Sequence, residues 1–286
     1  MIPWVFYALM AAFTLATADA ISKKAMGKTD ELVIAWVRQG YSLPFLSLAF
    51  FFITIPHLDG TFWLALLFIV PLEVTAIILY VKAIRLSPLS LTIPFMALSP
   101  VFIIFIAFFM LGELPDRSGF LGILLIVFGA YILNVRATRE GILGPIRAIK
   151  REKGSVLMII VALIYSVTST IGKISIQHSS PLFFGFFYPV VLTFVFTIIL
   201  SIKGGMSKVT SRPVLFLGIG FFIAIMVLSH FTALSMTDVA YMISVKRTSL
   251  IFSVIYGKFL FGEKNTGERL LGSVLMVAGV VLITVF

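Results

Sequence analysis

The sequence predicts an all-α integral membrane protein with ten transmembrane helices arranged as two inverted five-helix repeats. Three observations lead to this fold class. Of the 286 residues, 60% are hydrophobic and only 12% are charged, which leaves too little polar material to cover a soluble surface. Long apolar runs recur along the whole chain, and its second half repeats its first.

The first half contains five apolar runs separated by charged residues, Pro and Gly. A helix needs about 20 apolar residues to cross the hydrocarbon core of a bilayer, and we interpret each run as one span. Together they form a first repeat over residues 1–135. The predicted spans are residues 2–21, 32–55, 61–84, 88–111 and 118–135.

A basic connecting loop over residues 136–155 separates the two halves. Five further apolar runs follow it, so residues 156–286 form the second repeat. No room is left for a separate soluble domain. The predicted spans of this half are residues 156–176, 182–202, 213–234, 238–261 and 268–286.

The duplication becomes visible when the chain is laid on itself at an offset of 150 residues, where it matches without a gap. Because each copy has an odd number of spans, the second copy must start on the opposite side of the membrane. Inverted repeats commonly build transporters that hold a substrate near the midplane. The matching pairs include Gly112-Glu113 with Gly262-Glu263, Gly122 with Gly272, Gly129 with Gly279, Ser99 with Ser249, and Lys23 with Lys173.

Composition and motifs exclude several classes of protein. The chain has no cysteine and only three scattered histidines, so we expect no cofactor, no bound metal and no disulfide. A net charge of +10 in so apolar a chain points to lipid headgroups rather than nucleic acid. Neither a catalytic triad nor an HExxH motif occurs, so we expect no enzyme. A channel is disfavoured because no selectivity-filter signature is present.

Several motifs carry a family resemblance: the turn Ser87-Pro88-Leu89-Ser90, the span ends Leu111-Gly112-Glu113 and Phe261-Gly262-Glu263, and the glycines downstream of them. With these motifs the chain resembles the drug/metabolite transporter superfamily, specifically its ten-span proteins with two EamA-type repeats. The resemblance implies a multi-pass protein of the cell membrane that carries small organic solutes by secondary transport.

Lys246 and Arg247 are adjacent charges deep in the ninth span. A charge at the bilayer centre costs roughly 2.5 to 3.5 kcal/mol, so both must face a partner or a cavity. They either bind an anion or form a structural ion pair with an acid elsewhere. The run Ser244–Arg247 is similar to the Lys-Arg pair with which plastid sugar-phosphate translocators grip phosphate, which implies a phosphate contact for Lys246 and Arg247.

Two acidic residues are candidates for coupling or for a counter-ion role. Glu73, midway along the third span, is either a proton-coupling site or the counter-ion of Lys246 or Arg247. Asp19 can pair with Lys23, one helical turn further along the first span. Both acids also belong to the runner-up function below.

Three more residues are candidates for contact with a solute. Lys173 is the repeat equivalent of Lys23 but has no acid in the place of Asp19. Arg38 lies inside the second span, and Tyr188 takes its place in the second repeat. The substrate-binding candidates are therefore Lys246, Arg247, Lys173, Arg38 and Tyr188. We interpret His230 as a hydrogen-bonded packing residue, and Glu113 and Glu263 as residues of turns and helix N-termini.

The sequence thus predicts a secondary active transporter of a small anionic or zwitterionic metabolite that works by alternating access in the lipid bilayer. The alternative is a proton-coupled exporter of amino acids or cationic drugs through Glu73 and Asp19. Lys and Arg concentrate in the odd-numbered connections, which places both termini outside, whereas the resemblance implies cytoplasmic termini. The substrate, the direction and the coupling ion stay open, as does the choice between monomer and homodimer.

Overall fold

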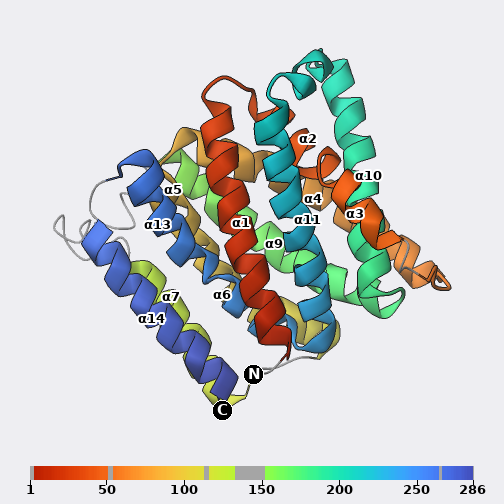
Figure 1. Cartoon of the computed structure of the whole chain (residues 1–286). Coiled ribbons are helices and arrows are strands. Elements are labelled where there is room, and N and C mark those ends of the chain that lie inside the picture. Colours follow the sequence, from red (N-terminus) through yellow and green to blue (C-terminus); the bar gives the residue numbers. More distant parts are fainter. Residues whose placement is uncertain (1–2, 51–53, 113–115, 133–151, 264–265, 286) are drawn as a thin grey trace.

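The computed structural model is all-helical over the residues that it describes, which confirms the predicted all-α class (Figure 1). It describes residues 3–50, 54–112, 116–132, 152–263 and 266–285. The predicted Glu113 and most of the predicted connecting loop lie outside them. The first half comprises α1 (Pro3–Met26), α2 (Glu31–Gly40), α3 (Leu43–Phe50), α4 (Gly60–Leu86), α5 (Leu89–Thr92), the 3-10 helix η1 (Ile93–Leu98), α6 (Ser99–Leu111) and α7 (Arg117–Ile132). The second half comprises α9 (Lys153–Gln177), α10 (Pro181–Ile202), the 3-10 helix η3 (Met206–Thr210), α11 (Pro213–Met236), α12 (Val239–Lys246), α13 (Ser249–Phe261) and α14 (Thr266–Val285).

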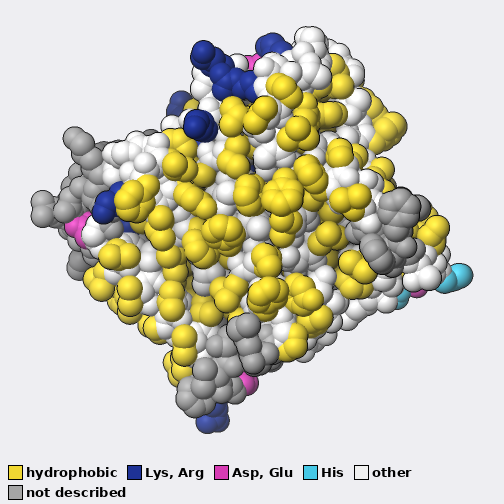
Figure 2. All heavy atoms as spheres, in the orientation of Figure 1, with side chains coloured by type: hydrophobic (Ala, Val, Ile, Leu, Met, Phe, Trp, Pro, Cys, Tyr) yellow, Lys and Arg dark blue, Asp and Glu magenta, His cyan; other side chains and the backbone are white. Residues whose placement is uncertain are grey.

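Seven helical segments within the described residues are long and apolar enough to cross a membrane: α1, α4, α5 to α6, α9, α10, α11, and α12 to α13. Large apolar side chains point outward from the bundle; Phe109 and Val214 are each 82% exposed. Figure 2 shows such side chains spread over the surface, with Lys and Arg mainly at the upper end of the view. Lipid is the environment in which so much exposed apolar surface is stable.

The chain is therefore a multi-pass membrane protein. The predicted second, fifth and tenth spans correspond to α2 with α3, to α7 and to α14, which are not among the seven segments. The number of ten spans stays a prediction.

The second predicted span, residues 32–55, is not one continuous helix, and its expected end is wrong. Its first half stops at Gly40, because Pro44 has no N–H to donate to the carbonyl of that residue. At the break, the backbone N–H and the hydroxyl of Ser42 both donate to the Gln39 carbonyl, the hydroxyl at 2.6 Å. The second half is helical over Leu43–Phe50, and residues 54–59 are not helical.

The fourth and ninth predicted spans are broken at different places. Pro94 is the second residue of η1 and Pro100 the second residue of α6, and each removes one helical N–H donor. The second repeat has Ser244 and Leu250 at these positions and stays α-helical as far as Lys246. Two equivalent spans thus present different backbones to the middle of the protein.

Helix packing follows the 150-residue repeat. Helix α1 packs along α11 and α4 along α9, and the offset exchanges these two pairs. Lys23 Nζ donates to the Ser87 carbonyl at 2.6 Å, and its equivalent Lys173 Nζ donates to the carbonyl of Thr237, the equivalent of Ser87, at 3.1 Å. The same lysine contact therefore fixes the end of α4 in one half and the end of α11 in the other.

Helices α7 and α14 lie side by side and meet through glycines (Figure 1). A Cβ atom at Gly129 would lie 2.6 Å from the Gly272 carbonyl oxygen, and one at Gly279 would lie 2.6 Å from that of Gly122. These two contacts are equivalent under the repeat. Small residues at such positions let two membrane helices approach each other closely.

Substituting Gly129 by Ala is expected to lower the thermal stability of the detergent-purified protein. Overpacking typically costs about 1–3 kcal/mol, which exceeds the gain of up to about 1 kcal/mol in helix propensity. Gly172→Ala in α9 is the matched control, because its Cβ would meet its nearest neighbours at 3.8 Å. A melting temperature of Gly129→Ala equal to or above that of Gly172→Ala would contradict the expected close packing.

Glu263 stabilises a helix N-terminus, but not the one expected from its sequence position. Its carboxylate accepts the backbone N–H groups of Leu89 and Ser90, each at 3.1 Å, at the start of α5 in the other half. Arg269 lies 3.4 Å from the same carboxylate. Glu263 reaches the N-terminus of α5 because α13 packs against that helix.

Helix α4 begins outside the apolar segment with a carboxylate cap. Asp59 accepts the N–H of Phe62 at 2.9 Å, and His178 Nδ1 lies 2.7 Å from its other oxygen. The Phe62 N–H and, next, the His178 contact favour the ionised form and hold the pKa of Asp59 below its ordinary value of 3.8.

The depressed pKa predicts an acid-sensitive contribution to stability. Such a group stabilises the folded state above its unfolded pKa, and the contribution is lost as pH falls through the folded pKa. Between pH 7 and pH 3, we expect the melting temperature of the wild type to fall further than that of Asp59→Asn, which keeps a capping oxygen that cannot ionise. Equal falls in the two proteins would show that this carboxylate does not contribute.

Candidate functional site

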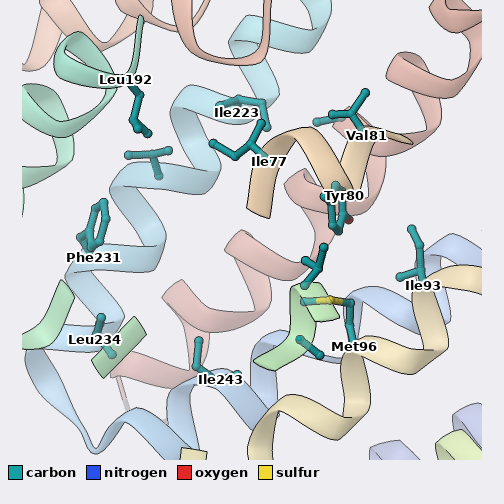
Figure 3. Packing of buried hydrophobic residues seen from close by; sticks show 14 of the residues in the cluster. Ile77, Tyr80, Val81, Ile93, Met96, Leu192, Ile223, Phe231, Leu234 and Ile243 are labelled. Carbon is teal, nitrogen blue, oxygen red and sulfur yellow. The ribbon is translucent and has the colours of Figure 1, made fainter. Parts of the chain in front are cut away.

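A cavity lies in the middle of the bundle and is lined by both halves of the chain. About 120 Å³ of it is accessible to the centres of water molecules. Its apolar wall includes Ile77, Leu192, Ile223 and Phe231, which Figure 3 labels. The charged and ionisable side chains among its described lining residues are Arg38, Glu73, Tyr80, Tyr165, Tyr188, His230, Lys246 and Arg247.

Arg247 presents its terminal guanidinium nitrogens to this cavity. Its Nε donates to Ser99 Oγ at 2.7 Å, and the described residues offer neither a hydrogen-bond acceptor for the two Nη atoms nor a carboxylate within 4 Å. These nitrogens are also not enclosed by protein. In the described part of the chain, every fully buried polar side-chain atom without a hydrogen-bond partner belongs to another residue. The residue itself is only 4% exposed, so its accessible N–H groups face the cavity.

Lys246 reaches the cavity from the last turn of α12. Its Nζ lies 3.1 Å from His230 Nδ1; an ammonium group can only donate, so Nδ1 accepts and the His230 ring is neutral. No carboxylate of the described residues lies within 4 Å of this ammonium. The C-terminal end of a helix carries partial negative charge, which favours both cations at this position.

Arg38, the third cation, already has a counter-ion. Its Nη1 lies 2.7 Å from Asp19 Oδ1, the Tyr80 hydroxyl donates to the other Asp19 oxygen, and the guanidinium carbon lies 5.4 Å from the centroid of the Tyr80 ring. The expected pairing of Asp19 with Lys23 is wrong. Lys23 instead reaches the free carbonyls at the end of α4, including that of Ser87.

Glu73 is the one acid among the described residues that line the cavity. Thr168 lines the same cavity, and the described part of the chain places no basic group within 4 Å of the Glu73 carboxyl group. Glu73 therefore forms no direct salt bridge with Lys246 or Arg247, and a counter-ion role at longer range stays a prediction. A role in proton coupling stays a prediction.

Tyr188 and Lys173 occupy different environments. The Tyr188 ring stacks on Phe184 with the ring centroids 4.9 Å apart. Tyr188 lines the cavity, but its hydroxyl group is enclosed by protein and has no hydrogen-bond partner among the described residues. Lys173 is not among the residues that line the cavity. Its Nζ binds the Thr237 carbonyl and lies 3.6 Å from Asp238, where it holds the turn between α11 and α12.

Comparison with known proteins identifies the family. The model of the EamA-like transporter family matches the chain twice, over residues 2–135 and residues 152–285. The chain belongs to the EamA-like transporter family. Its two matches correspond to two EamA repeats, so the protein is a membrane transporter of the drug/metabolite type, as the sequence motifs suggested.

Two other comparisons complete this result. No curated protein matches the chain. A crystal structure titled only as that of a protein is similar over 99% of this chain and 98% of its own, with a TM-score of 0.72 and 15% sequence identity. This likeness shows that the EamA-family transporter shares its fold with a protein of very different sequence.

Sequence reasoning missed the residues that hold the charged groups of this EamA-family transporter. Ser99 was identified only as one half of a repeated pair, although it directly precedes Pro100 in the fourth predicted span. Tyr80 was not noted, although it lies two helical turns after Glu73 on the same face of α4. These two positions in the sequence could have drawn attention to Ser99 and Tyr80. The charged groups that they contact, Arg247 and Asp19, lie on other helices.

Proposed function

We propose that this chain is a secondary active transporter that moves a small anionic or zwitterionic organic metabolite across the cell membrane by alternating access. One observation carries the proposal. Lys246 and Arg247 face the central cavity with no carboxylate of the described residues within 4 Å, whereas Asp19 neutralises Arg38. Charges interact strongly in such a low-dielectric environment, so the cavity favours a solute with an acidic group.

The two cations suit an oxyanion in complementary ways. Arg247 can offer two parallel N–H donors to a carboxylate or phosphate, while Lys246 supplies a compact point charge. Together with Glu73, they leave one positive charge in excess when all three are ionised. An anion compensates this charge, and a zwitterion can in addition direct its amino group toward Glu73.

Alternating access is supported by the relation between the two halves. The packing of α1 on α11 and of α4 on α9 is exchanged by the repeat offset, as expected for inverted repeats that move against each other around a central site. The bent fourth span and the broken ninth span contribute Met96 and Arg247 to the cavity. Interrupted helices at a repeat interface are typical of transport sites.

A ligand panel tests the proposed substrate class. The detergent-purified wild type, Lys246→Ala and the surface control Lys208→Ala are heated with phosphorylated sugars, carboxylates, amino acids and cationic drugs. A ligand that binds only the folded state raises its stability, by about 2.7 kcal/mol at a concentration of 100 Kd. We expect an anionic or zwitterionic compound to stabilise the wild type and Lys208→Ala but not Lys246→Ala. Stabilisation by cations alone, or an unchanged response of Lys246→Ala, would refute the proposal.

A second candidate is a proton-coupled exporter of amino acids or cationic drugs. It is favoured by Glu73, an acid that lines the cavity without a basic partner within 4 Å among the described residues. Transport by proteoliposomes under an imposed pH gradient tests it, with Glu73→Gln as the variant. If Glu73→Gln transports as the wild type does, this candidate is removed.

A further inference from the structure

The hydroxyl group of Ser99 has a fixed orientation. It donates its proton to the Met96 carbonyl at 2.7 Å, so its oxygen lone pairs remain to accept a hydrogen bond. The acceptor position is filled by Arg247 Nε at 2.7 Å. Because a hydroxyl has one proton, the bond to Met96 ensures that Ser99 acts as an acceptor toward the guanidinium group.

The sequence Ser99-Pro100 creates this arrangement. In a continuous α-helix the N–H of residue 100 would donate to the carbonyl of Met96, but Pro100 has no N–H. The Ser99 side chain and backbone N–H donate to that carbonyl instead. The Ser99 carbonyl lies 3.1 Å from the Ser166 hydroxyl of α9, whose single proton is shared with the nearer Ala162 carbonyl at 2.7 Å.

The bond to Ser99 determines which donors of Arg247 remain. With Nε engaged, the N–H groups on the two Nη atoms remain as donors, and they are the ones accessible from the cavity. We propose that Ser99 is a positioning residue that directs the terminal nitrogens of Arg247 at the acidic group of the transported solute. The inference rests on the proposed function and adds a residue that acts through Arg247.

The repeat supplies a matched control for this role. Ser249 is the equivalent of Ser99 and is equally buried, at 3% exposure. The equivalent of Arg247 is Ala97, so Ser249 has no equivalent arginine to position. Removing the two hydroxyl groups should therefore have different effects on anion binding.

Anion titrations of the purified protein test the positioning role. Acetate and inorganic phosphate are the probes, and the half-saturating concentration is read from thermal stabilisation at constant ionic strength. Without the serine acceptor the guanidinium group is no longer held in one orientation. Misplacing a binding group can cost up to about 100-fold, so Ser99→Ala should raise that concentration about tenfold or more. Ser99→Thr, which keeps the hydroxyl, and Ser249→Ala should stay within about threefold of the wild type.

Several results would overturn the inference. Wild-type affinity in Ser99→Ala, no rescue by Ser99→Thr, or an equal loss in Ser249→Ala would each do so. If Ser99→Ala does not fold, the isosteric pair Ser99→Thr and Ser99→Val gives the same comparison. Arg247→Gln separates the two proposals: if it loses anion binding while Ser99→Ala does not, only the positioning role fails. If the wild type binds neither anion, or Arg247→Gln binds as the wild type does, both proposals fail.

Discussion

Replacing Arg247 by Gln is expected to weaken the binding of an anionic solute about 100-fold or more. Removing one partner of a buried, charged hydrogen-bonded pair typically costs 2–5 kcal/mol, and 1.4 kcal/mol corresponds to a factor of ten in affinity. Gln retains N–H donors near Ser99 but loses the charge and the paired terminal nitrogens. Uptake into proteoliposomes measures the effect as a higher half-saturating concentration.

Two further variants make this result specific. Arg247→Lys should fall between the wild type and Arg247→Gln, because lysine keeps the charge without the planar fork. Arg85→Gln is the control, since Arg85 pairs with Glu31 at the exposed surface and should transport as the wild type does. A transport rate and affinity of Arg247→Gln close to those of the wild type would show that another group binds the anion.

Replacing Arg38 by Ala is expected to destabilise the folded protein by about 3–5 kcal/mol, the typical cost of leaving one partner of a buried ion pair uncompensated. The side chains of Arg38 and Asp19 are only 7% and 2% exposed. The double variant Asp19→Asn with Arg38→Met should recover much of the loss, because it buries no unpaired charge. Thermal or denaturant unfolding in detergent measures both changes.

The exposed pair of Lys208 and Asp30 provides the comparison for Arg38. Both side chains are 56% exposed, and surface ion pairs contribute about 0–1 kcal/mol, so Lys208→Ala should have little effect. If Arg38→Ala melted as Lys208→Ala does, the Asp19 pair would not be structural. Arg38 would then be free to serve the solute.

Much of the architecture could be predicted because duplication and apolar length are properties of the sequence itself. The offset of 150 residues correctly relates Lys23 to Lys173, and the structure gives both the same carbonyl contact. Depth in a span likewise selected Lys246 and Arg247, because a charge in the bilayer must face something other than lipid. Both cations line the cavity.

The partners of these charges could not be predicted, because they lie on other helices. Spacing along one helix pairs Asp19 with Lys23, whereas the structure pairs Asp19 with Arg38 of α2. Lys173 was assigned to the solute because it lacked an acid on its own face, yet its contacts lie at the end of α11. A pairing between helices depends on their distance and rotation, which a single sequence does not specify.

The two cations Lys246 and Arg247 have uncharged equivalents in the first repeat, and this difference is possible because both repeats lie in one chain. Met96 and Ala97 stand where the second repeat has Lys246 and Arg247. A dimer of two identical half-length chains, each with the Lys-Arg pair of the second repeat, would place four cations around the same cavity. Like charges repel strongly in such a place. With both copies in one polypeptide, mutations could accumulate in one copy alone. Divergence after duplication therefore allows a cavity in which the two cations that lack a carboxylate within 4 Å among the described residues both come from the second repeat.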